Sequence, residues 1–266
     1  MVEARGFGFE CVSQMELERV LELFSDLSPR RLLFTPNFAG REEYEFAVAQ
    51  DVNLTIDNVY CLQRWSDLFA GHKVILRIDP GEGRGHHDHV KTAGIASKFG
   101  IAMDDLAQVA EICAAHNIEV VGLHCHSGSG VFDAAMWQKH AALLAHIASS
   151  QFPQATILNL GGGLGVPYKF MQPAIDVAAL NQAIATVKTC HPRLSFWMEP
   201  GRYVAAECGV LVSRVTQVGE GGKENEGQCV WGCASLRVLA PRFRFVSRLS
   251  SRLKPFPTRR SSGKWA

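Results

Sequence analysis

The sequence predicts an α/β fold on a parallel sheet, specifically a TIM-type (β/α)8 barrel that lacks its first strand. Short β-rich runs alternate with amphipathic helical patterns, which is the order of right-handed β-α units. The runs are apolar rather than strictly alternating, as in strands that are covered on both faces. Seven units follow one another before residue 216, and the first strand begins at residue 7. A doubly wound sheet is the other arrangement that this pattern allows.

The expected elements follow from the period of the apolar residues. The strands are expected at 7–13, 31–36, 53–57, 73–79, 119–126, 156–160 and 194–199. Helical patterns lie between them, among others at 14–26, 42–50, 103–116, 134–149 and 176–190. In the first helix, Leu17, Val20, Leu21 and Phe24 recur at the spacing of one helix face.

Composition is that of a globular enzyme, with 47% hydrophobic and 20% charged residues among 266. No stretch resembles a signal peptide or reaches the roughly 20 consecutive apolar residues that a membrane span needs. The 8 cysteines are irregularly spaced, as free thiols in a reducing compartment are. The sequence therefore predicts a cytoplasmic protein with no membrane partner.

Two regions differ in charge. Residues 227–266 hold 9 of the 27 Lys and Arg residues and none of the 26 Asp and Glu residues. A polar, Gly-rich stretch at 219–227 has the composition of a linker. A basic run can mark a nucleic-acid arm, but no folded motif accompanies this one, which favours a disordered or non-native tail. We expect a barrel domain at 1–218, a linker and basic tail at 219–266, and no nucleic-acid partner.

The first of three chemical clusters spans residues 122–130. His124 and His126 are two apart on a strand and so point to the same face. An imidazole at a strand end can stack on a ring, and Ser129 can donate to an anion. A metal-binding His pair is an alternative, and so are histidines satisfied by neighbouring carbonyls.

The second cluster spans residues 158–165. Gly161, Gly162 and Gly163 directly follow an apolar strand. Consecutive glycines expose backbone N–H groups in a concave turn, which suits phosphate. A tight turn alone explains one or two of them. The spacing matches neither the dinucleotide fingerprint nor a P-loop.

The third cluster spans residues 196–203. Glu199 ends a strand and is costly to bury without a partner. Its carboxylate can hold a proton on a heterocyclic nitrogen. Beyond the Pro200-Gly201 turn, Arg202 offers a planar fork for phosphate or carboxylate. An ion pair between Glu199 and Arg202 is the alternative. Three complementary clusters on strand ends predict one site for a phosphorylated ring.

These motifs resemble the alanine-racemase-like barrel of the group IV amino-acid decarboxylases, which act on diaminopimelate, ornithine and arginine. The resemblance covers about residues 6–216. It is carried by Phe9-Glu-Cys-Val-Ser13, Arg77-Ile-Asp-Pro80, Ser97-Lys-Phe-Gly100, His126-Ser-Gly-Ser129, Gly161-Gly-Gly163 and Glu199-Pro-Gly-Arg202.

The resemblance implies pyridoxal 5′-phosphate as cofactor and no metal. The implied cofactor-binding residues are His126, Ser129, Gly162, Gly163, Glu199, Pro200, Gly201 and Arg202. Among them, His126 stacks on the pyridine ring, and Glu199 keeps the ring nitrogen protonated. Arg202 holds the phosphate with Ser129 and the glycines, and it is also the implied substrate-binding residue.

Within the family, Gly122-Leu-His-Cys-His126 and the spacing from Thr92 to Ser97 look most like diaminopimelate decarboxylase. Residues 85–92 resemble the form fused to aspartate kinase. Gly130 is closer to the ornithine enzymes. The resemblance thus implies a homodimer that converts meso-diaminopimelate to lysine. An ornithine- or arginine-type decarboxylase and a non-catalytic relic that binds phosphate are the alternatives.

Both ends depart from the family. The Schiff-base lysine belongs to the first barrel strand, and neither Lys73 nor Lys98 stands in that position. The family's C-terminal β-domain supplies a catalytic cysteine, but Cys229 and Cys233 lack its Cys-Glu-Ser-x-Asp context. We therefore assign no catalytic residue and expect little activity from this chain alone. A change of reading frame near 219–227 is our hypothesis for the tail, which sequencing of the coding DNA tests.

Overall fold

The structure is a computed structural model that describes residues 3–81, 99–167, 171–208, 217–220 and 229–232. The chain divides into two compact units. The first consists of Met1–Pro167 and Pro173–Tyr203, and the second of Tyr168–Gln172 and Val204–Ala266.

The first unit is built on a parallel sheet of seven strands. These are β1 (Phe9–Cys11), β2 (Leu32–Phe34), β3 (Asn53–Ile56), β4 (Lys73–Arg77), β5 (Glu119–His124), β6 (Ile157–Asn159) and β7 (Ser195–Trp197). Neighbours in the sheet are neighbours in the chain, from β1 to β7. A doubly wound sheet reverses its strand order at one point, and this sheet does not. The expected TIM-type barrel lacking a strand is confirmed, with β1 and β7 as the two edges.

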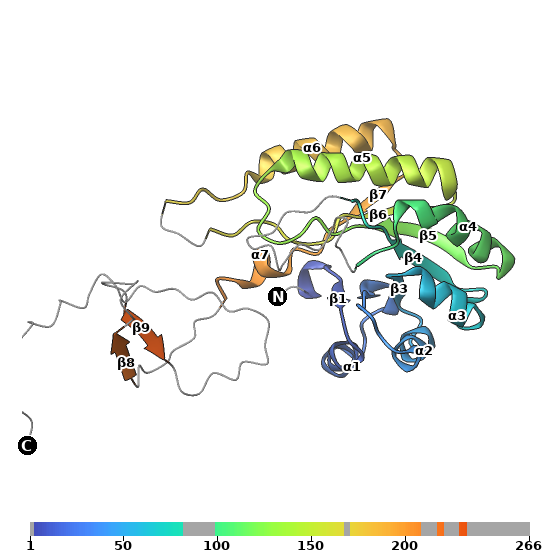
Figure 1. The fold of residues 1–266 in the computed structure, drawn as a ribbon, viewed down its shortest axis with the longest axis horizontal. Helices are drawn as coiled ribbons and strands as arrows, with labels where there is room; N and C mark the ends of the chain where they lie inside the picture. The colour runs from blue at the N-terminus through green and yellow to red at the C-terminus, as the bar shows by residue number, and fades with distance from the viewer. Residues whose placement is uncertain (1–2, 82–98, 168–170, 209–216, 221–228, 233–266) are drawn as a thin grey trace, which may run out of the picture. The chain divides into compact units, whose positions relative to one another are not determined.

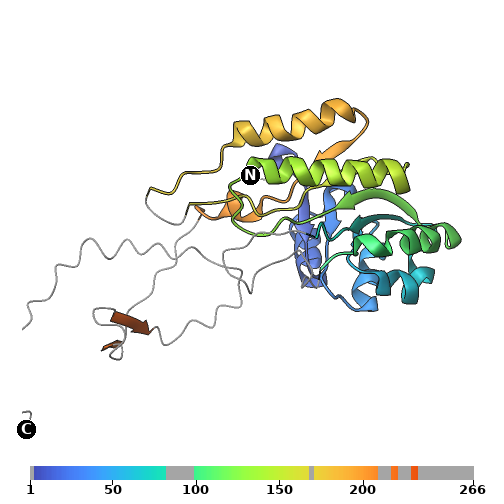
Figure 2. The same ribbon diagram turned by 45° about the horizontal axis from the view of Figure 1, so that its top comes forward.

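Within the described part of the chain, six helices cover the sheet. They are α1 (Gln14–Leu23), α2 (Arg41–Ala49), α3 (Val59–Phe69), α4 (Leu106–Ala115), α5 (Ala134–Gln151) and α6 (Val177–Cys190). They follow one another in an arc around the outside of the strands (Figure 1), and the turned view keeps them on that side (Figure 2). Short 3-10 turns at Glu3–Arg5, Pro29–Arg31 and Met103–Asp105 complete the connections.

Polar side chains start several helices where the sequence places them. Ser13, Asn58, Asp133 and Asp176 each accept a hydrogen bond from a backbone N–H in the first turn. Such caps satisfy donors that have no partner within the helix. Every strand and helix that the sequence analysis named is present, with ends that differ by a few residues. It did not name α3, which is interrupted by non-helical backbone at Trp65.

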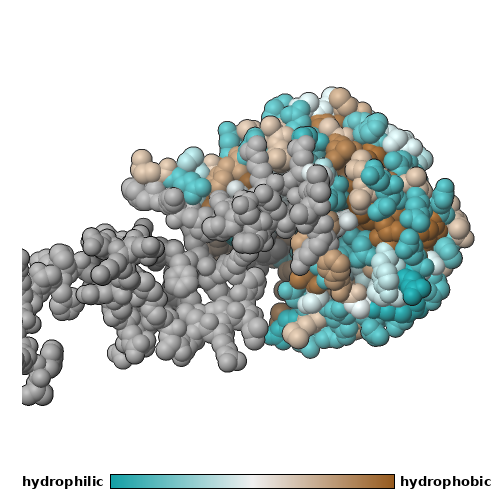
Figure 3. All heavy atoms as spheres, in the orientation of Figure 1, coloured by the Kyte–Doolittle hydropathy of each residue, from teal (hydrophilic) through white to brown (hydrophobic). Residues whose placement is uncertain are grey.

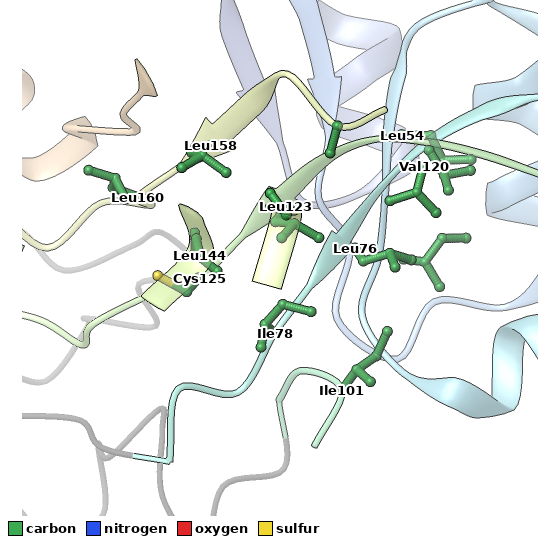
Figure 4. Close-up of a cluster of buried hydrophobic side chains, with 14 of the residues drawn as sticks. Leu54, Leu76, Ile78, Ile101, Val120, Leu123, Cys125, Leu144, Leu158 and Leu160 are labelled. Atoms are coloured by element: carbon green, nitrogen blue, oxygen red, sulfur yellow. The ribbon is translucent and has the colours of Figure 1, made fainter. Parts of the chain in front are cut away.

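The carboxyl ends of the strands carry apolar residues on one face and polar residues on the other. Leu76, Ile78, Leu123, Cys125, Leu158 and Leu160 belong to the hydrophobic core (Figure 4). The residues between them are Arg77, His124 and Asn159, which are buried but polar. Because successive strand residues point to opposite faces, the core lies on the helix side and a polar row lies on the other. At these ends the strands thus alternate between apolar and polar residues that are all buried, and this alternation places the site.

The outer face of the helices is mixed in character. Figure 3 shows mostly hydrophilic residues there, with separate hydrophobic areas among them. Within the described residues, no helix combines the length and the apolar character that crossing a bilayer requires.

In the second unit, β8 (Gln217–Glu220) pairs antiparallel with β9 (Cys229–Gly232). β8 begins two residues before the expected linker at 219–227, and β9 lies in the expected tail. The remainder of the expected linker and tail, 219–266, lies outside the described residues, so that division of the chain stays a prediction.

Candidate functional site

A cavity of about 310 Å³ lies in the first unit at the carboxyl ends of the strands. Its lining comprises Glu10, Val12, Thr35, Asn37, Arg77, Phe99, His124, His126, Ser129, Gly130, Gly162, Gly163, Leu164, Glu199, Gly201 and Arg202. Seven of the eight expected cofactor-binding residues are among them, and Pro200 is the exception. A second cavity of about 280 Å³, bordered by Cys190 and Arg193, contains none of the eight.

The glycine loop packs tightly between the other two clusters. A Cβ atom on Gly161 would lie 2.6 Å from the carbonyl oxygen of Cys125. On Gly162 it would collide with the carbonyl oxygen of Glu199, and on Gly163 with that of Gly128. Gly163 also has a φ of +92°, which side chains rarely adopt. These residues are glycines because three strand-end segments meet here.

His126 is oriented by this loop. The backbone N–H of Gly162 donates to its Nδ1 at 3.2 Å. Burial lowers the pKa of His126 to about 4, and the proximity of His124 and Arg77 adds to the effect. The imidazole is therefore neutral near pH 7, and its flat face suits stacking on a ring. The part of Gly162 in phosphate binding stays a prediction.

Glu199 is held by residues from the two neighbouring strands. Asn159 Nδ2 donates to its Oε1 at 2.7 Å, and His124 Nε2 lies 3.4 Å from the same oxygen. Burial alone would raise the pKa of Glu199, but His124, His126 and Asn159 outweigh it and lower the pKa. The carboxylate thus stays charged. Asn159 is a partner that the sequence analysis did not name.

Arg77 was named only as part of a motif, without a role. Its guanidinium lies over the Phe99 ring, 5.0 Å from the centroid, and it donates to Asn37 Oδ1. Burial lowers its pKa, while Glu199 and other acidic groups oppose the change. A charged residue between the core residues Leu76 and Ile78 was the available sequence signal.

Glu10 reaches the same cavity from β1, which is the edge strand opposite to β7 and Glu199. Solvent contacts its side chain, but the surrounding protein makes the charged form costly. This desolvation, followed by repulsion from Glu199 and Glu16, raises its pKa to about 8. Two carboxyl groups with separated pKa values therefore face one cavity, a common feature of functional sites.

The described lining of the cavity contains no lysine. Lys73 pairs with Glu119 at 3.8 Å, and Lys188 donates to the carbonyl of Pro192. Lys98, and the motif residues 85–97 before it, lie outside the described residues. Among residues that are described, no group of three His, Cys, Asp or Glu side chains is arranged to hold a metal ion.

Known proteins share this architecture. The pyridoxal-binding domain of the pyridoxal-dependent decarboxylases matches residues 1–206. Diaminopimelate decarboxylase of Methanothermobacter thermautotrophicus is 29% identical over 241 residues, and that of Escherichia coli is 30% identical over 235. Each match covers 85% of this chain and 55% of the relative. A crystal structure of a diaminopimelate decarboxylase superimposes with a TM-score of 0.74 at 27% identity, over 84% of this chain and 54% of that one.

The chain thus spans about half the length of the curated relatives that it matches. The family match includes all three strand-end clusters, from His126 to Arg202. The chain belongs to the pyridoxal-dependent decarboxylases, matches their pyridoxal-binding domain, and shares the family's cofactor, pyridoxal phosphate.

Proposed function

We propose that the cavity binds pyridoxal 5′-phosphate and that the protein serves the decarboxylation of meso-diaminopimelate to lysine. One observation carries the proposal: His126, Glu199 and the glycine loop converge on one cavity of about 310 Å³. The groups fit the cofactor, because a neutral imidazole suits the ring face and a charged carboxylate suits a protonated ring nitrogen.

Each residue then has a task. His126 carries the ring on its face, and Glu199 holds the proton on the ring nitrogen. Ser129, Gly162, Gly163 and Arg202 take the phosphate, with Pro200 and Gly201 shaping the turn beside it. When bound, the cofactor supplies a cationic ring that accepts the electron pair left behind by the departing carboxylate.

The substrate is proposed from the named relatives and from the chemistry of Arg202. Its planar fork suits a carboxylate, which diaminopimelate carries at both ends and ornithine at one. Binding affinities of the reduced pyridoxal phosphate adducts of diaminopimelate, ornithine and arginine would rank the three without turnover. Equal or tighter binding of the ornithine adduct would overturn the choice of substrate.

For the chain by itself we propose little activity, because the described lining of the cavity offers no lysine to tether the cofactor. Incubation with pyridoxal phosphate and borohydride tests this. Stoichiometric labelling of one lysine, with carbon dioxide release from diaminopimelate, would contradict it.

Binding is measured with pyridoxamine 5′-phosphate, which needs no lysine. We expect saturable quenching of tryptophan fluorescence, with much weaker binding of pyridoxamine, which has no phosphate. Arg202→Ala should weaken binding of the phosphate ester at least about tenfold, the loss of one charge-assisted contact. Arg30→Ala is the control, because Arg30 pairs with Asp51 on an exposed surface. No saturable binding by the unaltered chain would refute the proposal.

A further inference from the structure

His124 is the last residue of β5, between the core residues Leu123 and Cys125. Its side chain is 1% exposed, and it belongs to the lining of the cavity. Among the residues that the structure describes, neither ring nitrogen has a partner that meets the distance and angle of a hydrogen bond. The nearest acidic atom is Glu199 Oε1, 3.4 Å from Nε2.

A buried imidazole with no hydrogen bond is costly, and such groups in native proteins call for an explanation. Here the position of Glu199 supplies one. Nε2 lies 3.4 Å from a carboxylate oxygen, which only accepts, so the contact is an electrostatic one between His124 and Glu199. Loss of that contact would leave both groups buried without compensation.

Two strand ends act on the same oxygen. Asn159, the last residue of β6, donates to Glu199 Oε1 at 2.7 Å, and His124 approaches that atom from β5. The side-chain oxygen of Asn159, Oδ1, in turn accepts from the backbone N–H of Gly161 at 2.9 Å, which fixes the amide. Among the described residues, the other charged or titratable groups that interact with Glu199 are Glu10, Arg77, Cys125 and His126.

We propose that His124 is a positioning residue for Glu199: with Asn159 it fixes Oε1 and keeps the carboxylate charged, so that Oε2 is presented to the ligand. The effect of His124 on Glu199 does not depend on a bound ligand. That the ligand atom is the ring nitrogen of pyridoxal phosphate rests on the proposed function.

The first test needs no ligand. The carboxyl carbon of Glu199 is followed by NMR across pH in the full chain, and its signal is assigned with Glu199→Gln. We expect His124→Phe, which removes the donor but keeps a flat ring, to raise the pKa of Glu199 by about one unit or more. His124→Gln restores an N–H donor and should recover most of the shift.

His146→Phe is the control for loss of a histidine, because His146 occupies an exposed position of α5. It should leave the titration of Glu199 unchanged. A purely structural role for His124 predicts lower stability with an unaltered Glu199 titration, and that result would overturn the proposal.

If His124→Phe does not fold, an NMR titration of the unaltered chain still tests the proposal. We then expect the ring nitrogens of His124 to change chemical shift at the pH where Glu199 titrates. Constant shifts through that titration would overturn the proposal.

The second test adds pyridoxamine 5′-phosphate labelled with nitrogen-15 in the ring. We expect a protonated ring nitrogen in the unaltered chain and in His124→Gln, and loss of that proton at a pH at least about one unit lower in His124→Phe. A protonation unchanged by His124→Phe would overturn the ligand part. Absence of binding by the unaltered chain would instead overturn the proposed function, while the ligand-free titration still judges the action on Glu199.

Discussion

The side-chain amide of Asn159 joins two of the three strand ends at the site, donating to Glu199 Oε1 at 2.7 Å across 40 positions of sequence. Its own oxygen accepts from the N–H of Gly161, the first residue of the glycine loop. The amide of Asn159, a residue that is 1% exposed, thus orients both the Glu199 carboxylate and the glycine loop.

Replacing this amide by a carboxylate should destabilise the chain. In Asn159→Asp, the new carboxyl group lies beside that of Glu199 in a buried site, so that only one of the two can be charged at a time. We expect a loss of about 2 kcal/mol or more in unfolding free energy at pH 8, with a smaller loss at pH 5, where a shared proton bridges the oxygens. Denaturant unfolding at the two pH values measures it. Asn181→Asp, on the exposed face of α6, is the control, and equal losses in both variants would count against the contact.

Glu10 gives stability a pH dependence of its own. Its pKa is about 8 in the folded chain against an ordinary value of 4.5. A raised pKa means that the folded state holds the proton more tightly. The stability from protonated Glu10 is therefore complete below pH 4.5 and is lost as pH rises through 8.

Glu10→Gln removes this dependence. From pH 4.5 to above 8 we expect unfolding free energy to fall less in Glu10→Gln than in the unaltered chain. His126 acts in the opposite direction at lower pH, since its lowered pKa of about 4 costs stability as pH falls below 6.5. Glu111→Gln, on an exposed position of α4, controls for loss of one charge. Parallel pH profiles for Glu10→Gln and the unaltered chain would contradict the raised pKa.

Ser127, which follows His126 in the chain, forms a buried polar pair with His140 on α5. Ser127 Oγ and His140 Nδ1 lie 2.6 Å apart, and both side chains are buried. We expect Ser127→Ala to lower the unfolding free energy by about 1–3 kcal/mol, because it removes a buried hydrogen bond. Ser149→Ala should have little effect, since that exposed hydroxyl donates to a carbonyl of its own helix. Thermal or denaturant unfolding compares the two, and similar losses would argue against the pair.

Alanine substitutions at Gly163 and Gly71 distinguish the cost of close packing from the cost of backbone strain. Both have positive φ, +92° and +75°. A Cβ on Gly163 collides with the carbonyl of Gly128, whereas one on Gly71 meets nothing within 4 Å. We expect Gly71→Ala to cost about 1–2 kcal/mol from φ alone and Gly163→Ala more than about 3 kcal/mol. Denaturant titration is the measurement, and equal costs would show that the loop is not tightly packed.

Local patterns in the sequence determined the order of strands and helices and the three clusters at the strand ends. Apolar period, capping side chains and consecutive glycines act over a few residues, so they can be recognised without neighbours. His126, Ser129, Glu199 and Arg202 were found in this way, and the structure brings them to one cavity.

The tertiary structure alone decided which further residues join them. Glu10 and Glu199 come from the two edge regions of the sheet, and Arg77 from its middle, yet all three line one cavity. Their meeting depends on the curvature of the sheet and on the register between parallel strands, which pairs Arg77 with His124 and His124 with Asn159. Register is a property of paired strands, so no single run of sequence contains it.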